Sequence, residues 1–229
     1  YWASAPAATW VSRMLDQCIL LTRAGAGAQV KVTYRNPNSN KPTTATLTAV
    51  ADGTTSVQDI VNYARDFSDL ESPFESKTLP GGYGYINLLS QSATLMTPFP
   101  DRAIKKVIER MQKDKVPGLI LDLRGNSGGD PKFTAEFAGH FLKEKRVIGD
   151  MVSFSSKKNG FALNEAERIV IEPREPYFDG PVVVLVHRST RDTGQVIAAA
   201  LQGRPNVLVT GVLGSEGSLA KVGGEVKMP

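Results

Sequence analysis

The sequence predicts an α/β protein whose larger part is a layered core of mostly parallel strands, preceded by a small β-rich module. Apolar runs at 118–123, 181–186 and 207–211 are typical of strands buried within a sheet. Helix-like segments alternate with these runs, which indicates βαβ crossovers and hence parallel strands. The 229 residues, 41% of them apolar, can form a core and a small module. We therefore expect two units, residues 1–80 and 81–229.

The first predicted element is an amphipathic helix within residues 6–21. Trp10, Met14 and Cys18 recur there at helical spacing, and Val11 and Leu15 widen the stripe. We expect this apolar stripe, Cys18 included, to face a core. Because Cys18 is the only cysteine, an internal disulfide is excluded.

A β-hairpin and a linker are predicted to follow. Apolar residues alternate within 30–34 and 45–49, and the Asn/Pro/Ser cluster between them is typical of a loose hairpin loop. Residues 57–67 are consistent with a short helix. Residues 71–82 end in a Gly pair and are predicted to be a loop at the domain boundary.

The predicted core begins with a strand at 82–89. A helix follows, opened by Pro100 at its first position and by Asp101 as a plausible N-cap. Further helices are expected at 131–142 and 193–201, between the buried strands.

Composition argues against several classes of protein. The net charge of +4 is not concentrated in a Lys/Arg block and aromatic residues are only 7%, so no nucleic-acid partner is expected. Two histidines and one cysteine, far apart in sequence, predict no metal site, and phosphate-binding motifs that would indicate a cofactor are absent. No apolar run approaches the ~20 residues of a spanning helix, and the first 25 residues lack signal-peptide features. We therefore expect a soluble chain without a transmembrane segment.

Two loops after buried strands are candidate sites, because such sheets bind ligands at the carboxyl ends of their strands. In the loop 121–130, Gly128 and Gly129 allow backbone amides to point at a negative oxygen. The simpler interpretation is a strand-to-helix turn that needs glycine. In the second loop Asp192 precedes the helix at 193–201, where unpaired amides stabilise anions. The simpler interpretation there is an ordinary N-cap.

Four segments follow one another in the core: GYGYINL, a helix before GLILDLRGNSGG, then GPVVVLVHRSTRDTGQVIAAALQ and VLVTGVLGSEGS. In this order they resemble the C-terminal processing (tail-specific) serine proteases, which include the tricorn core and the interphotoreceptor retinoid-binding protein as distant relatives. The resemblance covers most of residues 81–218 and implies a ClpP/crotonase-like layered core. It also implies that residues 1–80 hold part of a PDZ-like module, and it favours an exported or periplasmic setting.

The resemblance implies a changed catalytic pair. The family's nucleophilic serine aligns with Asp192, and the lysine that deprotonates it aligns with Glu216. A serine–lysine pair works because a lysine of lowered pKa takes the hydroxyl proton, which two carboxylates cannot reproduce. The family's oxyanion hole aligns with the amide of Gly128 or Gly129 and with that of Thr193.

The histidine of a tricorn-type site is also missing. His140 falls in the second core helix, and His187 occupies the position of a structural asparagine of the family.

Three functions remain open. The chain could be a non-peptidase relative that binds a peptide or small-molecule ligand in the former cleft. Alternatively, Asp192 and Glu216 could be a recruited carboxylate pair doing acid–base or nucleophilic chemistry, with one pKa raised by the other. Thirdly, peptidase activity could persist through another group, for which the candidates are Ser189, Thr190, Thr193, Ser218 and Lys221.

Overall fold

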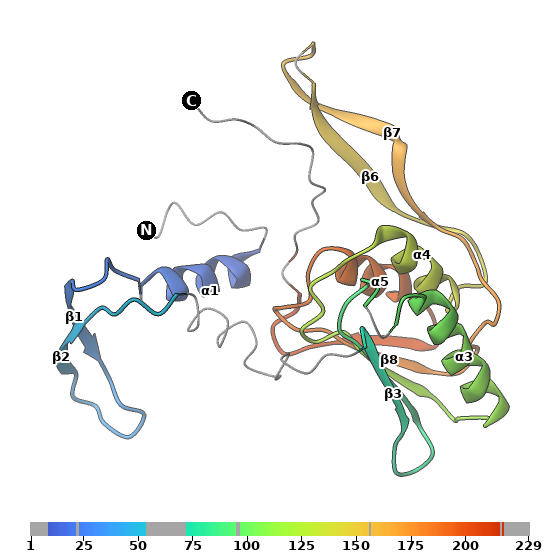
Figure 1. Cartoon of the computed structure of the whole chain (residues 1–229), viewed down its shortest axis with the longest axis horizontal. Helices are drawn as coiled ribbons and strands as arrows, with labels where there is room; N and C mark the ends of the chain where they lie inside the picture. The colour runs from blue at the N-terminus through green and yellow to red at the C-terminus, as the bar shows by residue number, and fades with distance from the viewer. Residues whose placement is uncertain are drawn as a thin grey trace. The chain divides into compact units, whose positions relative to one another are not determined.

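The computed structural model describes residues 9–21, 23–53, 72–94, 97–155, 157–215 and 217 (Figure 1). The chain divides into two compact units, residues 1–65 and 66–229.

The first unit contains the predicted helix and hairpin. Helix α1 spans Trp10–Leu21, and strands β1 (Gln29–Tyr34) and β2 (Thr43–Thr48) pair antiparallel, with Val32 opposite Ala45. Both elements are confirmed. The short helix proposed at 57–67 lies outside the described residues.

The predicted core-facing stripe of α1 is confirmed at Val11, which is buried, and wrong at Trp10, Met14 and Cys18, which are exposed. Among the described residues of this unit, one helix and one two-stranded hairpin do not supply a second apolar layer wide enough to cover the whole stripe.

The second unit is built on a five-stranded sheet of order β3-β4-β5-β8-β9. Strands β4, β5, β8 and β9 are parallel, which confirms the predicted core, and β3 is antiparallel to β4. The strands span Phe74–Thr78 (β3), Gly84–Leu88 (β4), Leu119–Asp122 (β5), Val182–Leu185 (β8) and Val207–Thr210 (β9).

The prediction of a loop over residues 71–82 is wrong, because these residues contain strand β3. Only Phe74 of this strand is buried, and the rest of the strand is polar. Its place is therefore set by backbone pairing with β4 at the sheet edge and not by an apolar pattern.

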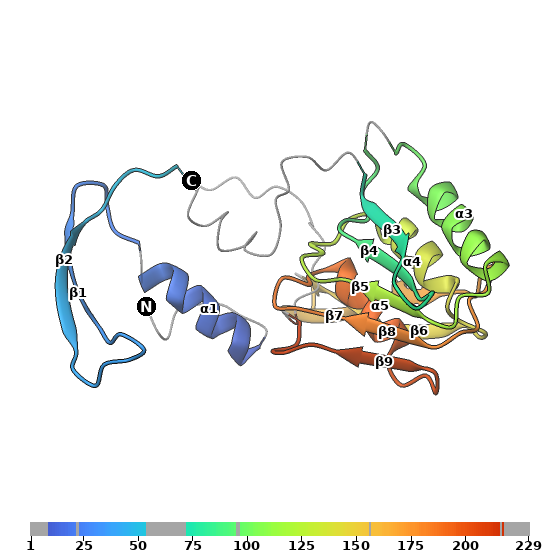
Figure 2. The ribbon, with the colours of Figure 1, turned by 90° about the horizontal axis from the view of Figure 1, so that it is seen from below.

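Three helices cover one face of the sheet, as Figure 2 shows: α3 (Pro100–Lys113), α4 (Pro131–Gly139) and α5 (Thr193–Leu201). Side chains alternate across the strands, so Ile86 and Leu121 are buried beneath the helices, while Tyr85 and Ile120 are only half-buried on the other face. Burial of the core strands on both faces was expected, but in the described part of the chain the helices lie on one face.

Helix α3 begins differently from the prediction. Its N-cap is Phe99, which makes no side-chain capping bond, while Asp101 lies in the first turn after Pro100. Proline at the first helical position lacks only an amide that would be unpaired anyway. The assignment of Asp101 as N-cap is therefore wrong by two residues.

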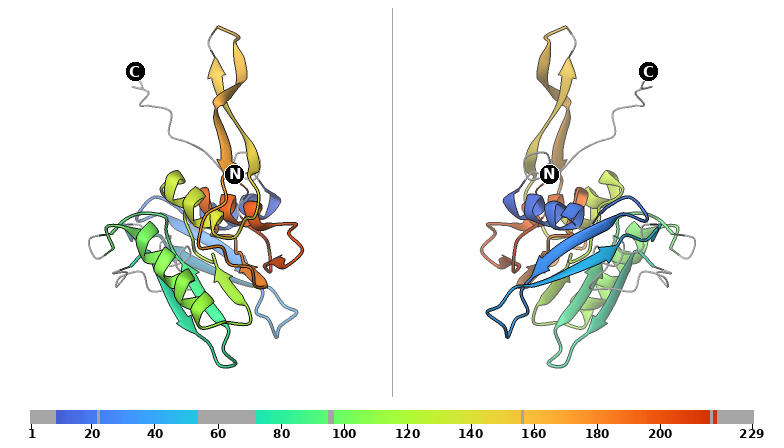
Figure 3. Two further views of the ribbon diagram at one scale, coloured as in Figure 1. Left: turned by 90° about the vertical axis from the view of Figure 1, so that its right-hand side faces the viewer. Right: turned by 90° about the vertical axis from the view of Figure 1, so that its left-hand side faces the viewer.

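Strands β6 (Arg146–Ser155) and β7 (Gly160–Ile171) form a long antiparallel ribbon that the sequence did not predict. It projects beyond the helices (Figures 1 and 3). Register shifts between Val147 and Met151 interrupt its alternation, which explains why its period-2 pattern is weak.

Candidate functional site

Asp192 lies on a sharp turn between β8 and α5. Its backbone has φ +46° and ψ −127°, in a region that side chains rarely adopt. Its carbonyl accepts the Gln195 N–H at 3.0 Å, and the neighbouring Arg191 carbonyl accepts the Gly194 N–H at 2.9 Å. Asp192 stands at the N-cap position, yet its carboxylate makes no capping hydrogen bond. The backbone therefore presents this carboxylate without using it as a cap.

Asn126 fixes the glycine loop against its neighbours. The fully buried side chain donates to the Leu88 carbonyl at 2.9 Å and accepts the Gly128 N–H at 2.9 Å. Its own carbonyl accepts the Arg191 N–H at 2.8 Å. A Cβ at Gly194 would lie 2.5 Å from Asn126 Oδ1, so only glycine fits there. One asparagine thus joins the end of β4, the glycine loop and the turn that holds Asp192.

The two predicted oxyanion glycines differ. The Gly128 N–H is already bound by Asn126, whereas Gly129 forms an isolated parallel bridge with Gln91. In that bridge the Gln91 N–H donates to the Gly128 carbonyl, which leaves the Gly129 N–H directed elsewhere. Thr193 is the first residue of α5, where an amide lacks an intrahelical partner. Neither the Gly129 nor the Thr193 N–H is bonded to another residue that the structure describes.

The Asp192 side chain lies over the open face of Gly128. A Cβ at Gly128 would be 2.7 Å from Asp192 Oδ2 and 2.8 Å from its Cβ. The structure therefore brings Asp192, Gly128, Gly129 and Thr193 together, as the candidate site requires.

Gln195 holds the loop that contains position 216. Its Oε1 accepts the Ser215 hydroxyl at 2.8 Å and the Gly217 N–H at 2.6 Å. A cavity of about 480 Å³ lies between α5, β9 and residues 211–215. Glu216 itself, like Ser218 and Lys221, lies outside the described residues.

Of the remaining hydroxyl candidates in the described residues, Ser189 and Thr190 lie in the turn before α5, and Thr193 is the first residue of that helix. The fully buried Thr190 Oγ1 donates to the Leu123 carbonyl at 2.8 Å and accepts the His187 N–H at 2.9 Å, so it holds the turn together. Ser189 is buried, and the Thr193 hydroxyl donates to the Gly129 carbonyl at 3.4 Å. Burial, followed by the charges of nearby arginines, lowers the pKa of His187.

A buried ion pair beside the site was not predicted. Asp122 is fully buried and accepts two side-chain bonds and one backbone bond from Arg124, at 2.7–2.9 Å, and the Tyr85 hydroxyl at 2.7 Å. The Arg124 side chain remains 53% exposed. Burial raises the pKa of Asp122, but the bonds from Arg124 and Tyr85 outweigh it and hold the pKa below its usual value. An aspartate inside the apolar run at 118–123 was the available signal, because a buried carboxylate needs a partner.

We expect Asp122→Asn to lower the free energy of unfolding by about 2 kcal/mol at neutral pH, because it removes charge-assisted hydrogen bonds from a buried site. Since the folded pKa is depressed, this stabilisation is complete above the unfolded pKa and disappears as the pH falls through the folded value. Urea unfolding should therefore separate variant and wild type fully above about pH 5, and the difference should begin to shrink near about pH 4 and vanish only when the pH has fallen below the depressed pKa of the folded protein.

The exposed Asp179–Lys143 pair provides the matched control. Asp179→Asn should leave stability almost unchanged, because solvent screens exposed pairs. A difference for Asp122→Asn that does not shrink in acid would contradict the electrostatic account.

The residues that the structure describes contain neither a metal cluster nor a membrane-spanning helix. These contain no group of three or more His, Cys, Asp or Glu side chains placed to hold a metal ion. None of the helices there has the length and apolar character needed to cross a membrane.

Comparison with known proteins gives one family. Residues 82–220 match the model described as peptidase family S41. The carboxyl-terminal-processing protease of Picosynechococcus sp. is 28% identical over 197 residues, which cover 86% of this chain and 41% of that protein. The carboxy-terminal processing protease CtpA of Bacillus subtilis is 28% identical over 147 residues, covering 64% and 28%. The chain thus spans less than half the length of these relatives.

Among solved structures, a putative peptidase from Parabacteroides merdae shares the fold. Its TM-score is 0.50 at 19% identity, over 67% of this chain and 46% of that one.

Proposed function

This chain belongs to peptidase family S41, and on that premise we propose that it binds a peptide in the former active-site cleft without cleaving it. The observation that carries the proposal is the Asp192 carboxylate, which lies against Gly128 where the family's nucleophilic serine aligns. A carboxylate cannot be deprotonated further to attack an amide as a serine hydroxyl does.

The charge of Asp192 also opposes peptidase chemistry. A tetrahedral intermediate places a negative oxygen at the amides of Gly129 and Thr193, and an adjacent carboxylate repels that charge. The same two N–H groups remain suitable donors to the uncharged carbonyl of a bound peptide. These features support binding over acyl transfer.

An extended chain could bind along the last strand of the sheet. Strand β9 lies at the edge of the sheet, part of it lines the cavity beside Gln195 and Ser215, and edge strands can accept a peptide strand. We propose an extended C-terminal tail with apolar side chains as the ligand class.

A recruited carboxylate enzyme is the second candidate. It is favoured by the strained backbone of Asp192 and by the missing capping bond, because strain at an unsatisfied side chain is common at catalytic sites. We also propose that the first 80 residues form a partial PDZ-like module and that the core is ClpP/crotonase-like. Support for the former comes from α1 followed by the β1–β2 hairpin.

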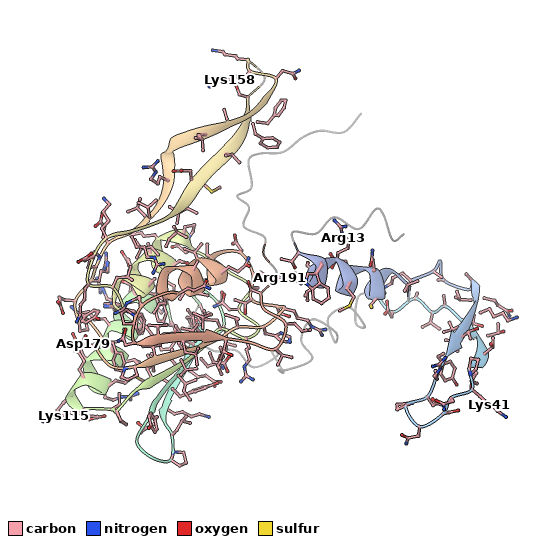
Figure 4. The ribbon with its side chains drawn as sticks, turned by 180° about the vertical axis from the view of Figure 1, so that it is seen from behind. Arg13, Lys41, Lys115, Lys158, Asp179 and Arg191 are labelled. Carbon is pink, nitrogen blue, oxygen red and sulfur yellow. The ribbon has the colours of Figure 1, made fainter. Side chains whose placement is uncertain are left out.

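The test uses the full chain, a fluorophosphonate probe, and a fluorescein-labelled decapeptide with an apolar C-terminus. We expect no covalent labelling, no cleavage, and saturable binding measured by anisotropy. Asp192→Arg, which fills the space over Gly128, should weaken binding at least tenfold, or about 1.4 kcal/mol. Lys143→Ala is the control, since Lys143 pairs with Asp179, which lies at the opposite end of the core from Arg191 (Figure 4).

Labelling of the wild type would show that a hydroxyl nucleophile is active and would overturn the proposal. Turnover that disappears in a folded Asp192→Asn variant would replace it by the recruited-carboxylate enzyme. Absence of both binding and turnover would also reject it.

A further inference from the structure

The ribbon formed by β6 and β7 carries four large apolar side chains on one face near its tip. Pairing sets Val152 opposite Leu163 and Phe154 opposite Phe161, and residues two apart on a strand share a face. These side chains are 53%, 64%, 61% and 77% exposed in that order. The two phenylalanine rings meet edge to face, with centroids 5.9 Å apart. We call these four residues the ribbon patch.

The fold itself gives no reason for the ribbon patch. The ribbon extends away from the helices that cover the sheet (Figures 1 and 3), and none of the four residues belongs to the core cluster or packs against it. Contiguous exposed apolar side chains of this size usually mark a surface that another body covers.

The charge at the tip of the ribbon indicates what kind of partner covers the ribbon patch. Residues 151–164 contain Lys157 and Lys158 and no acidic residue. Both lysines are exposed, and Lys158 lies at the far end of the ribbon (Figure 4). Aromatic and aliphatic side chains flanked by lysines suit an interface with anionic lipid, where the rings enter the headgroup boundary and the ammonium groups meet phosphate and carboxylate.

We propose that the tip of the β6–β7 ribbon binds an anionic lipid surface. The ribbon patch faces the acyl boundary, with Phe154 and Phe161 inserted most deeply. Lys157 and Lys158 lie in the turn at the end of the ribbon, from which their stems can reach head groups without entering the hydrocarbon.

A second copy of the chain fits less well. The ribbon patch offers roughly 500 Å² if a fully exposed large side chain presents about 200 Å². A stable protein interface buries about 800 Å² on each partner. A lipid surface needs no such minimum, because binding grows with each inserted side chain and with each neutralised lysine.

The test is co-sedimentation of the full chain with sucrose-loaded vesicles. With vesicles containing phosphatidylserine we expect half-binding at roughly millimolar lipid, weaker than a single myristoyl chain gives. Phe154→Ser with Phe161→Ser should lower the partition coefficient roughly tenfold or more. Lys157→Glu with Lys158→Glu should remove the preference for phosphatidylserine over pure phosphatidylcholine, and added salt should weaken wild-type binding.

Val147→Ser is the matched control, because Val147 is also exposed on the ribbon but lies at its base. It should bind vesicles like the wild type. Circular dichroism and urea unfolding of each variant establish that the ribbon variants remain folded.

Three results would overturn the proposal. One is no sedimentation with phosphatidylserine vesicles. Another is undiminished binding by the double phenylalanine variant. The last is a wild-type dimer in light scattering that the phenylalanine substitutions convert to monomer, because a second copy would then occupy the ribbon patch.

Discussion

The double substitution Asp192→Ser and Glu216→Lys should be labelled by a fluorophosphonate probe about a hundredfold or more faster than the wild type, in line with the contribution of a positioned general base. The serine would stand on the turn that now presents the carboxylate, at the start of α5. The N–H groups of Gly129 and Thr193 would face the oxygen of the attacked phosphonate. Labelling rates measured by gel fluorescence test this expectation.

The two single variants are the controls. Asp192→Ser alone lacks a base, and Glu216→Lys alone lacks a hydroxyl, so neither should exceed the wild-type rate appreciably. A folded double variant that stays unlabelled would contradict the inference that the amides of Gly129 and Thr193 still form an oxyanion hole.

Gly129→Ala should destabilise the protein by about 3–5 kcal/mol, near the upper end for single substitutions. At φ +150° the new Cβ would lie 2.7–2.9 Å from three backbone atoms of Gln91. Gln91 is fully buried and its backbone is hydrogen-bonded to both sides of the glycine loop, so it has no room to withdraw. Urea unfolding gives the change in free energy.

Two further variants separate the clash from backbone strain. Gly203→Ala has φ +82° with no atom within 4 Å of its Cβ, so it should cost only about 1 kcal/mol. Gln91→Ala combined with Gly129→Ala should not restore stability, because the contacts are with backbone atoms. Recovery in that double variant would show that the Gln91 side chain, and not its backbone, resists the alanine.

Local sequence patterns were sufficient where an element buries a regular face. Helix α5 spans the predicted residues 193–201, and β5 and β8 lie inside the predicted apolar runs. In these segments the spacing of the buried side chains follows from the geometry of the helix or strand. The sequence of the segment alone is therefore sufficient to predict the element. The ribbon β6–β7 and the edge strand β3 were missed because their buried residues do not form a regular period-2 pattern: register shifts interrupt the ribbon, and only Phe74 of β3 is buried.

The candidate site divides in the same way. Sequence alone put Asp192 before α5 and the glycines after β5, and so predicted that each loop leaves the carboxyl end of a buried strand. Only the structure showed that the Asp192 side chain lies against Gly128. It could not distinguish Gly128, whose N–H is bound by Asn126, from Gly129, whose N–H is not.

The sequence by itself determined the α/β class, the parallel core and the family, because each of these follows from patterns and motifs within short segments of the chain. Only the tertiary structure decided that Asp192 does not cap its helix, that Asn126 joins segments from 88 to 191, and that Asp122 is buried with Tyr85 and Arg124. Those contacts depend on where distant strands place their ends. The hydrogen-bond partners of these residues come from distant segments that meet only when the sheet has formed. The sequence of a single segment therefore does not identify them.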